Sequence, residues 1–176
     1  MKLLRVPLAR ERPGLCGPYT LAAVLRFHGD RASLAILTRL CRATRARGTS
    51  PERLAAAARA RGFRTCVKAW ADFGDLAAAL RRGLPPIVLW FSGDEGHYSA
   101  VSGLDRTSVA LADPELGKIR RMPRDVFRRV WFDFSTSGPE KTSRLYARWM
   151  LVIEPREEIR YSTAAVAHAS AGVAQW

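Results

Sequence analysis

The sequence predicts an α+β fold in which N-terminal helices pack on a C-terminal antiparallel sheet. Apolar residues recur at helical spacing through the first half of the chain, whereas short strand-like runs, separated by Gly, Pro and Asp turns, follow from residue 85 onward. Helices that precede strands, instead of alternating with them, are typical of the α+β class. The 176 residues are enough for one good hydrophobic core and few for two.

Three helices are predicted in the first part of the chain, at residues 16–28, 32–43 and 49–62. The first two are predicted from apolar residues that recur every three or four positions. The third has the most complete boundary signals, because Ser50 can cap its N-terminus, Pro51 fits its first position and Gly62 fits its C-terminal end.

Strands dominate the rest of the chain, after a first strand at 64–70 and a short helix at 75–83. The later strands are expected at residues 85–92, 97–105, 108–114, 118–122 and 144–155, with a brief helix at 123–131 before the last of them. Residues 1–156 are expected to form a single domain. The tail 157–176 is rich in small residues, and we expect it to be loosely ordered.

The chain is strongly basic, with a formal net charge of +13 at pH 7. Its arginines are spread along the sequence in pairs such as Arg81-Arg82 and Arg120-Arg121, and no zinc-finger spacing, RNA-binding signature or basic region with heptads accompanies them. These observations argue against nucleic acid as the main partner. They favour a solvated basic surface that steers an acidic peptide toward the protein.

Cysteine spacing and hydropathy set expectations for cofactors and for the cellular location of the protein. Three cysteines cannot all pair and none has CxxC spacing, so we expect no disulfide framework, no metal site and no organic cofactor. Cys41 and Cys66 are expected to be core thiols. Arg5 and Pro7 interrupt the apolar start of the chain, and no later run has the length of a membrane span. We therefore expect a soluble cytoplasmic protein.

Cys16 is the candidate nucleophile, with His97 and Asp113 as its candidate partners. Cys16 opens a helix, where unpaired backbone N–H groups and the helix dipole stabilise a thiolate. His97 begins one predicted strand and Asp113 ends the next, so a tight turn between antiparallel strands would bring them side by side. The carboxylate would then hold the imidazole in the tautomer that accepts the thiol proton. Asp105 is a rival acid, but its LDRTS context predicts the turn itself.

Three motifs resemble the bacteriocin-processing cysteine peptidases, papain-like enzymes that remove double-glycine leader peptides. The motifs are CGPYTLAAVLRFHGD, GHYSAVSGLD and ADPELGKIRRMPRDVFRRVWFDF, and the resemblance extends from about Arg10 to Pro155. It implies Cys16 as nucleophile, His97 as general base and acid, and Asp113 as its orienting partner. It also implies a papain-like fold and peptide-bond cleavage through an acyl-enzyme. A peptide, in particular an acidic amphipathic leader, is the expected partner.

One position departs from the family pattern. The family has a glutamine six residues before the cysteine, whose amide completes the oxyanion hole with the cysteine backbone N–H. Arg10 stands there in this chain, with Glu11 beside it. The resemblance makes Arg10 and the Cys16 backbone the candidate oxyanion hole. Two alternatives stay open: a papain-like acyltransferase or cyclase in peptide or natural-product maturation, and a catalytically degenerate domain that only binds a peptide.

Overall fold

The structure is a computed structural model that describes residues 2–136 and 143–156. The helices in this part of the chain are α1 (Cys16–Phe27), α2 (Leu34–Leu40), α3 (Pro51–Ala60), α4 (Phe73–Arg81) and α5 (Arg124–Val130). The strands are β1 (Arg64–Lys68), β2 (Ile87–Ser92), β3 (Glu95–Leu104), β4 (Ser108–Asp113), β5 (Lys118–Pro123), β6 (Phe132–Thr136), β7 (Ser143–Ala147) and β8 (Met150–Glu154). The predicted tail at 157–176 lies outside the described residues, and the single domain expected over 1–156 stays a prediction.

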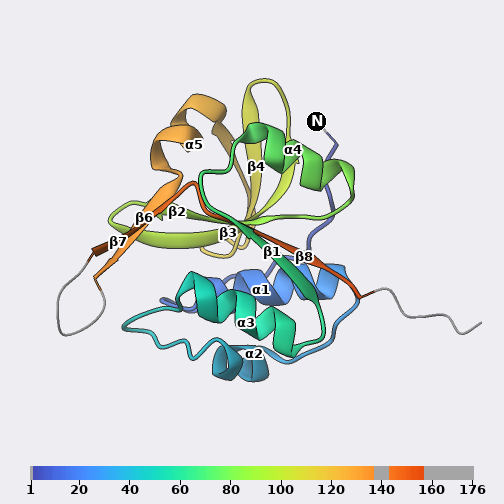
Figure 1. Cartoon of the computed structure of the whole chain (residues 1–176), viewed down its shortest axis with the longest axis vertical. Helices are drawn as coiled ribbons and strands as arrows, with labels where there is room; N and C mark the ends of the chain where they lie inside the picture. The colour runs from blue at the N-terminus through green and yellow to red at the C-terminus, as the bar shows by residue number, and fades with distance from the viewer. Residues whose placement is uncertain (1, 137–142, 157–176) are drawn as a thin grey trace, which may run out of the picture.

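The strands form one large antiparallel sheet and a separate hairpin. The strand order in the six-stranded sheet is β1-β8-β2-β3-β4-β5, and β6 pairs with β7. In Figure 1, α1, α2 and α3 lie below the sheet, and α4 and α5 lie above it. The predicted α+β class, with helices packed on an antiparallel sheet, is confirmed.

Side chains of the sheet alternate between two hydrophobic cores, one on each face. On β2, Ile87 and Leu89 belong to the core that α1, α2 and α3 cover, whereas Val88 and Trp90 belong to the core that α4 and α5 cover. This alternation follows from the two-residue period of a strand. Both faces of the central strands are therefore buried. A shift of a strand by one residue would exchange the side chains of the two cores, so the burial fixes the register of these strands.

Two expectations from the sequence are wrong. The segment 144–155 is not one strand: it divides at Arg148, whose left-handed φ of 46° interrupts the extended chain, and its first part pairs with β6, which the sequence pattern did not predict. Cys66 is exposed, because β1 is an edge strand, whereas Cys41 is buried as predicted.

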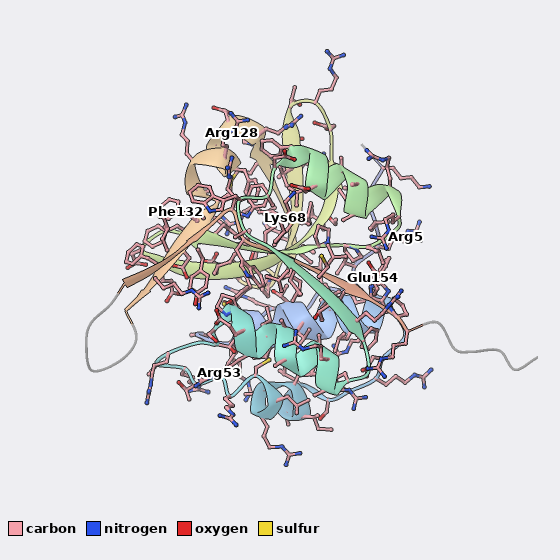
Figure 2. The ribbon with its side chains drawn as sticks, viewed as in Figure 1. Arg5, Arg53, Lys68, Arg128, Phe132 and Glu154 are labelled. Atoms are coloured by element: carbon pink, nitrogen blue, oxygen red, sulfur yellow. The ribbon has the colours of Figure 1, made fainter. Side chains whose placement is uncertain are left out.

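Basic side chains are distributed around the molecule. Figure 2 shows Arg128 on α5 near the top of the view and Arg53 on α3 near the bottom, so basic side chains lie on both sides of the sheet. Among the residues that the structure describes, no helix is both long and apolar enough to cross a membrane.

Candidate active site

Cys16 is the first residue of α1, and it is half-buried. No side chain caps this helix at its N-cap residue, Leu15. The partial positive charge of the helix N-terminus therefore remains available to stabilise a thiolate at Cys16. Leu21 and Leu25, which are fully buried, anchor the helix under the sheet, so the thiol stands on a rigid element.

Gly17 lets the start of α1 approach the sheet closely. A Cβ added at Gly17 would overlap the Cγ2 methyl of Thr49 and press against the ring of Tyr98. The Tyr98 hydroxyl donates to the Thr49 carbonyl at 3.1 Å, and the Thr20 hydroxyl donates to the Tyr98 carbonyl at 2.9 Å. These bonds hold the surroundings of Gly17 in place, so the glycine after Cys16 is a packing requirement of the site.

His97 and Asp113 form a buried pair on neighbouring strands. His97 lies near the start of β3 and Asp113 ends β4, and the two residues are 4% and 0% exposed. Nε2 of His97 lies 2.8 Å from Oδ1 of Asp113. When Nε2–H donates to the carboxylate, Nδ1 is left as the nitrogen that can accept a proton.

Cys16 and Asp113 both act on His97. Burial alone would lower the pKa of His97, because the imidazolium loses solvation. Hydrogen bonds with Asp113 and with the Cys16 side chain, together with the charges of those two groups, outweigh this effect and raise the pKa of His97 above its ordinary value. A sulfur, an imidazole and a carboxylate from α1, β3 and β4 therefore interact as one set.

Asp113 has two further partners. The backbone N–H of Glu115 donates to its Oδ1 at 3.0 Å, and Nε of Arg120 donates to its Oδ2. Burial by itself would raise the pKa of Asp113, but the bonds from His97 and Arg120 outweigh it and lower that pKa. The carboxylate therefore stays ionised in a fixed orientation.

Trp90 covers the imidazole of His97. The two residues face each other in the β2–β3 register, and their rings meet edge-on with centroids 5.4 Å apart. The indole N–H of Trp90 donates to the Ser99 hydroxyl at 3.1 Å, and the Arg120 guanidinium lies 5.4 Å from the centroid of the Trp90 ring. This packing restricts the imidazole to one orientation and shields its bond to the carboxylate from water.

His97, Asp113 and Glu115 also lie close enough together to be considered as a cation site, with ligand atoms within 4.8 Å of one another. Their observed partners account for this cluster without a cation. His97 bonds Asp113, and Arg120 donates to both carboxylates, at 2.8 Å in the case of Glu115. The guanidinium supplies the positive charge that a metal ion would bring.

The segment before α1 brings Glu11 to the site and leaves Arg10 exposed. The backbone N–H of Glu11 donates to the Pro114 carbonyl at 2.8 Å. This bond holds the segment against the turn at residues 114–117, the corner between β4 and β5. The Glu11 carboxyl interacts with the charges of His97 and Asp113. The role of Arg10 as oxyanion donor stays a prediction, and in the structure it is the neighbouring Glu11, not the exposed Arg10, whose charge interacts with the buried pair.

Asp105 lies in the turn between β3 and β4, as the sequence predicts. Its carboxylate accepts bonds from the backbone N–H groups of Thr107 and Ser108, at 2.9 and 2.7 Å. These bonds lower the pKa of Asp105 to about 2. Asp105 therefore stabilises the turn, and Asp113 is the acid that meets the imidazole.

Arg120 and Glu11 both interact with the buried pair, and the sequence pattern singled out neither of them as a site residue. Arg120 faces Leu111 in the β4–β5 register, so it lies on the same face of the sheet as Asp113. The two-residue period of this hairpin is a signal that predicts an arginine beside the acid. The approach of Glu11 to the pair has no such local signal in the sequence.

Comparisons with known proteins identify the family of the chain. Residues 9–136 match the family model of the Peptidase C39 family. An uncharacterized protein of Methanothermobacter thermautotrophicus is 35% identical over 127 residues, which cover 72% of this chain and 82% of that protein. The transport/processing ATP-binding protein ComA of Streptococcus pneumoniae is 32% identical over 118 residues, which cover 66% of this chain and 16% of ComA.

Solved structures share the fold. The peptidase domain of Streptococcus ComA, a bi-functional ABC transporter involved in a quorum sensing pathway, superposes with a TM-score of 0.69 at 24% identity, covering 86% of this chain and 100% of that domain. A double glycine motif protease from an AMS/PCAT transporter, in complex with the leader peptide, superposes with a TM-score of 0.65 at 19% identity, covering 87% and 94% of the two chains. Because the family model spans well over half of the sequence, the chain belongs to the peptidase C39 family and is a cysteine peptidase.

Proposed function

We propose that the protein cleaves the peptide bond after a Gly-Gly leader, with Cys16 as nucleophile, His97 as general base and acid, and Asp113 as the residue that orients the imidazole. The observation that carries this proposal is His97 itself, which interacts with the Cys16 side chain and bonds the Asp113 carboxylate at 2.8 Å. A nucleophile, a base and an orienting acid within mutual reach are what acyl transfer requires.

The reaction follows from these positions. The Cys16 thiolate attacks the carbonyl carbon, a C–S bond forms, and the C=O π electrons move to the oxygen. When the C=O bond re-forms, the C–N bond breaks and His97 gives its proton to the leaving amine. Water, deprotonated by His97, then attacks the thioester and releases the leader acid with the free thiol. Asp113 keeps the imidazole in orientation throughout, and Arg120 keeps that carboxylate ionised.

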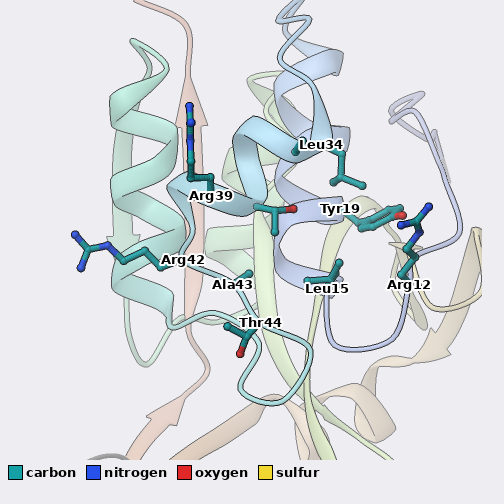
Figure 3. A pocket seen from close by; sticks show the side chains of 10 residues that line it. Arg12, Leu15, Tyr19, Leu34, Arg39, Arg42, Ala43 and Thr44 are labelled. Carbon is teal, nitrogen blue, oxygen red and sulfur yellow. The ribbon is translucent and has the colours of Figure 1, made fainter.

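A groove beside Cys16 suits a peptide. It has a volume of about 840 Å³, and its lining includes Leu15, the residue before the nucleophile. Tyr19 from α1 and Leu34 from α2 also line it, and Figure 3 shows both side chains over the groove. An amphipathic helix that lays its apolar face on such a surface is a recurring mode of peptide recognition.

The charges around the groove favour an acidic leader. Arg12, Arg39 and Arg42 line it beside the apolar residues, and Figure 3 shows Arg39 and Arg42 extending outward from the region of α2. Carboxylates on the polar face of a leader helix would meet these guanidinium groups, while the net charge of +13 would speed the encounter. The double glycine motif protease with the same fold was solved in complex with the leader peptide, which supports a peptide partner here.

A reducing compartment suits this chemistry, because the nucleophile has to remain a free thiol. Cys16, Cys41 and Cys66 are all free. Free thiols are typical of cytoplasmic proteins, so we place the activity in the cytoplasm.

The test uses a synthetic peptide with an acidic helical leader that ends in Gly-Gly and continues into a short cargo. We expect the wild-type protein to cut after the second glycine and Cys16→Ala to leave the peptide intact. Quenched reactions of the wild type should contain a protein species heavier by the leader acyl group. Cys66→Ala is the matched control, since it removes an exposed thiol from the edge strand and should retain activity.

The outcomes separate the parts of the proposal. Cleavage by Cys16→Ala, or no cleavage by the wild type, would contradict the peptidase mechanism. Equal cleavage of a matched Ala-Ala peptide would contradict only the Gly-Gly specificity. An adduct that forms without hydrolysis, and transfers to an added amine, would identify an acyltransferase.

A further inference from the structure

We infer that Glu11, as a neutral carboxyl group, donates a hydrogen bond to the oxyanion that forms when Cys16 attacks the substrate. The inference rests on the proposed function and deepens it, because it assigns the second oxyanion donor beside the Cys16 backbone N–H. A carboxyl donor differs from an amide donor in one respect: it loses its donor proton when it ionises.

The position of Glu11 is fixed by the corner that follows β4. Its backbone N–H donates to the Pro114 carbonyl at 2.8 Å. The backbone of Arg10 packs against Gly117 so closely that a Cβ at Gly117 would lie 3.1 Å from the Arg10 nitrogen, and the φ of +64° also requires glycine there. The same corner begins at Asp113, so Glu11 is held beside the buried histidine–aspartate pair.

One carboxyl oxygen of Glu11 is buried without a partner. Within the described part of the chain, Oε2 of Glu11 has no hydrogen-bond partner and almost no solvent access. A buried carboxylate in this situation loses its solvation without compensation, whereas a neutral carboxyl loses less and keeps a proton to donate. The substrate oxygen, once it carries a negative charge, is the acceptor that this proton lacks.

The charged groups that face Glu11 act on its ionisation in both directions. Burial is the main cause of its shift. The positive charge of His97 lowers the pKa of Glu11, whereas the negative charges of Asp113, Glu115 and Glu95 raise it, and the result is a pKa of about 7. Glu11 is therefore mostly neutral in mildly acidic solution and ionised in mildly alkaline solution.

The role of Glu11 involves no net proton transfer. As the Cys16 sulfur bonds the carbonyl carbon, the C=O electron pair moves to the oxygen, and the O–H of Glu11 bonds the charge that develops there. As the C=O bond re-forms and the C–N bond breaks, the charge leaves the oxygen and Glu11 retains its proton. The leaving amine takes its proton from His97, so the two acids have separate tasks.

Ionisation of Glu11 would remove this donor. Above its pKa the group is a carboxylate, which cannot donate and repels the oxyanion. Activity should therefore fall as the pH rises through about 7, because the neutral fraction falls about tenfold between pH 6 and pH 8. Loss of the His97 proton produces a second decline at higher pH, since the pKa of His97 is raised.

The experiment compares the pH dependence of kcat/KM for the wild type, Glu11→Gln and Arg10→Gln on the Gly-Gly peptide. We expect the wild type to lose about tenfold in kcat/KM between pH 6 and pH 8. Glu11→Gln, whose amide donates at every pH, should lose no activity over that range. Arg10→Gln tests the rival donor at the neighbouring exposed position: the wild-type pH profile is expected, and a profile that no longer responds to pH would assign the donor to position 10 and overturn the role of Glu11.

A second readout separates this inference from the proposed function. A leader peptide that ends in glycinal forms a hemithioacetal with Cys16, and its oxygen occupies the oxyanion position. Its Kd should rise about tenfold from pH 6 to pH 8 for the wild type and stay constant for Glu11→Gln. If the aldehyde binds but no peptide is cleaved, peptidase activity fails while this comparison still decides the role of Glu11. Superimposable profiles for the two proteins, in Kd or in kcat/KM, would overturn it, and failure of the aldehyde to bond to Cys16 would overturn both proposals.

Discussion

His97 and Asp113 are joined across two neighbouring strands by a hydrogen bond of 2.8 Å that almost no solvent reaches. The pair depends on the β3–β4 register, in which Ala100 faces Ala112, so that the start of one strand meets the end of the next. The base and its acid are therefore built on the sheet, whereas Cys16 is built on α1. The packing of α1 against β3 decides whether the two halves of the site meet.

Asp113→Asn is expected to lower kcat by about 10²- to 10⁴-fold with little change in KM, because an amide can donate to Nε2 and so hold His97 in the wrong tautomer. The measurement is steady-state cleavage of the Gly-Gly peptide, with circular dichroism to show that the fold is retained. A raised KM with an unchanged kcat would instead indicate that Asp113 contributes to substrate binding.

Asp105→Asn is the matched control for this change and should retain full activity. Its expected effect is on stability. The pKa of Asp105 is lowered to about 2, because the ionised carboxylate accepts the bonds of the turn. These bonds stabilise the folded wild type at any pH above the ordinary carboxyl pKa. The stabilisation is lost as the pH falls toward 2 and the carboxylate is protonated. The variant should lack this acid dependence in urea unfolding. Equal losses of activity in the two variants would contradict the assignment of Asp113.

Iodoacetamide is expected to modify Cys16 and spare Cys41 in the native protein. Cys41 is 0% exposed, and burial raises its pKa to about 12, so it has no reactive thiolate. Cys66 is exposed and has to be removed first, as Cys66→Ser, to leave a clear comparison. His97→Ala should slow the labelling of Cys16. Peptide mapping by mass spectrometry gives the rates, and equal labelling of Cys16 and Cys41 would contradict an activated nucleophile.

The hairpins of the sheet could be predicted because their signals are local. The strand expected at 118–122 is β5, and the one expected at 108–114 contains β4, since the turn residues between them set the register. The insertion of β8 between β1 and β2 has no local signal, because it depends on contacts distant in sequence. Exposure of Cys66 is a consequence of that topology, which leaves β1 at the edge.

The residues of the candidate site likewise include some with a local signal in the sequence and some without one. Cys16, His97 and Asp113 could be chosen from the sequence because each stands at or near the end of an element, and adjacent strands bring the last two together. The inferred role of Glu11 could not be predicted, because its position beside the pair depends on one tertiary hydrogen bond, from the Glu11 backbone N–H to the Pro114 carbonyl. A shift of one residue in an irregular segment is invisible to periodicity.

Gly17→Ala is expected to lower the free energy of unfolding by about 1–3 kcal/mol, although alanine favours helices, because the new methyl would overlap the methyl of Thr49. Thr49→Ser removes that methyl and keeps the hydroxyl that donates to the Cys41 carbonyl at 2.7 Å. The double variant should therefore be less destabilised than the sum of the two single variants. Urea unfolding measures the cycle, and strictly additive losses would show that the overlap is not the cause.

Binding of an acidic leader to Cys16→Ala is expected to weaken as salt rises, because Arg12, Arg39 and Arg42 line the groove. Raising the ionic strength from 0.01 to 1 M shortens the Debye length from about 30 to about 3 Å, which screens long-range attraction. Isothermal titration calorimetry gives the Kd at each salt concentration. Binding that does not respond to salt would indicate that the apolar side chains carry the affinity.

Charge reversal distinguishes the groove from the general field of a basic protein. Arg39→Glu/Arg42→Glu should weaken leader binding by about tenfold or more at physiological salt, because it removes two guanidinium partners and adds two repulsive charges at the groove. Arg128→Glu/Arg129→Glu makes the same change in net charge on α5, which lies on the opposite side of the sheet from α2 in Figure 1. Because that site is separated from the groove by the whole sheet, its effect at physiological salt, where the Debye length is about 8 Å, should be small. An equal loss in both double variants would mean that net charge alone attracts the leader, and the groove would then lose its electrostatic role in recognition.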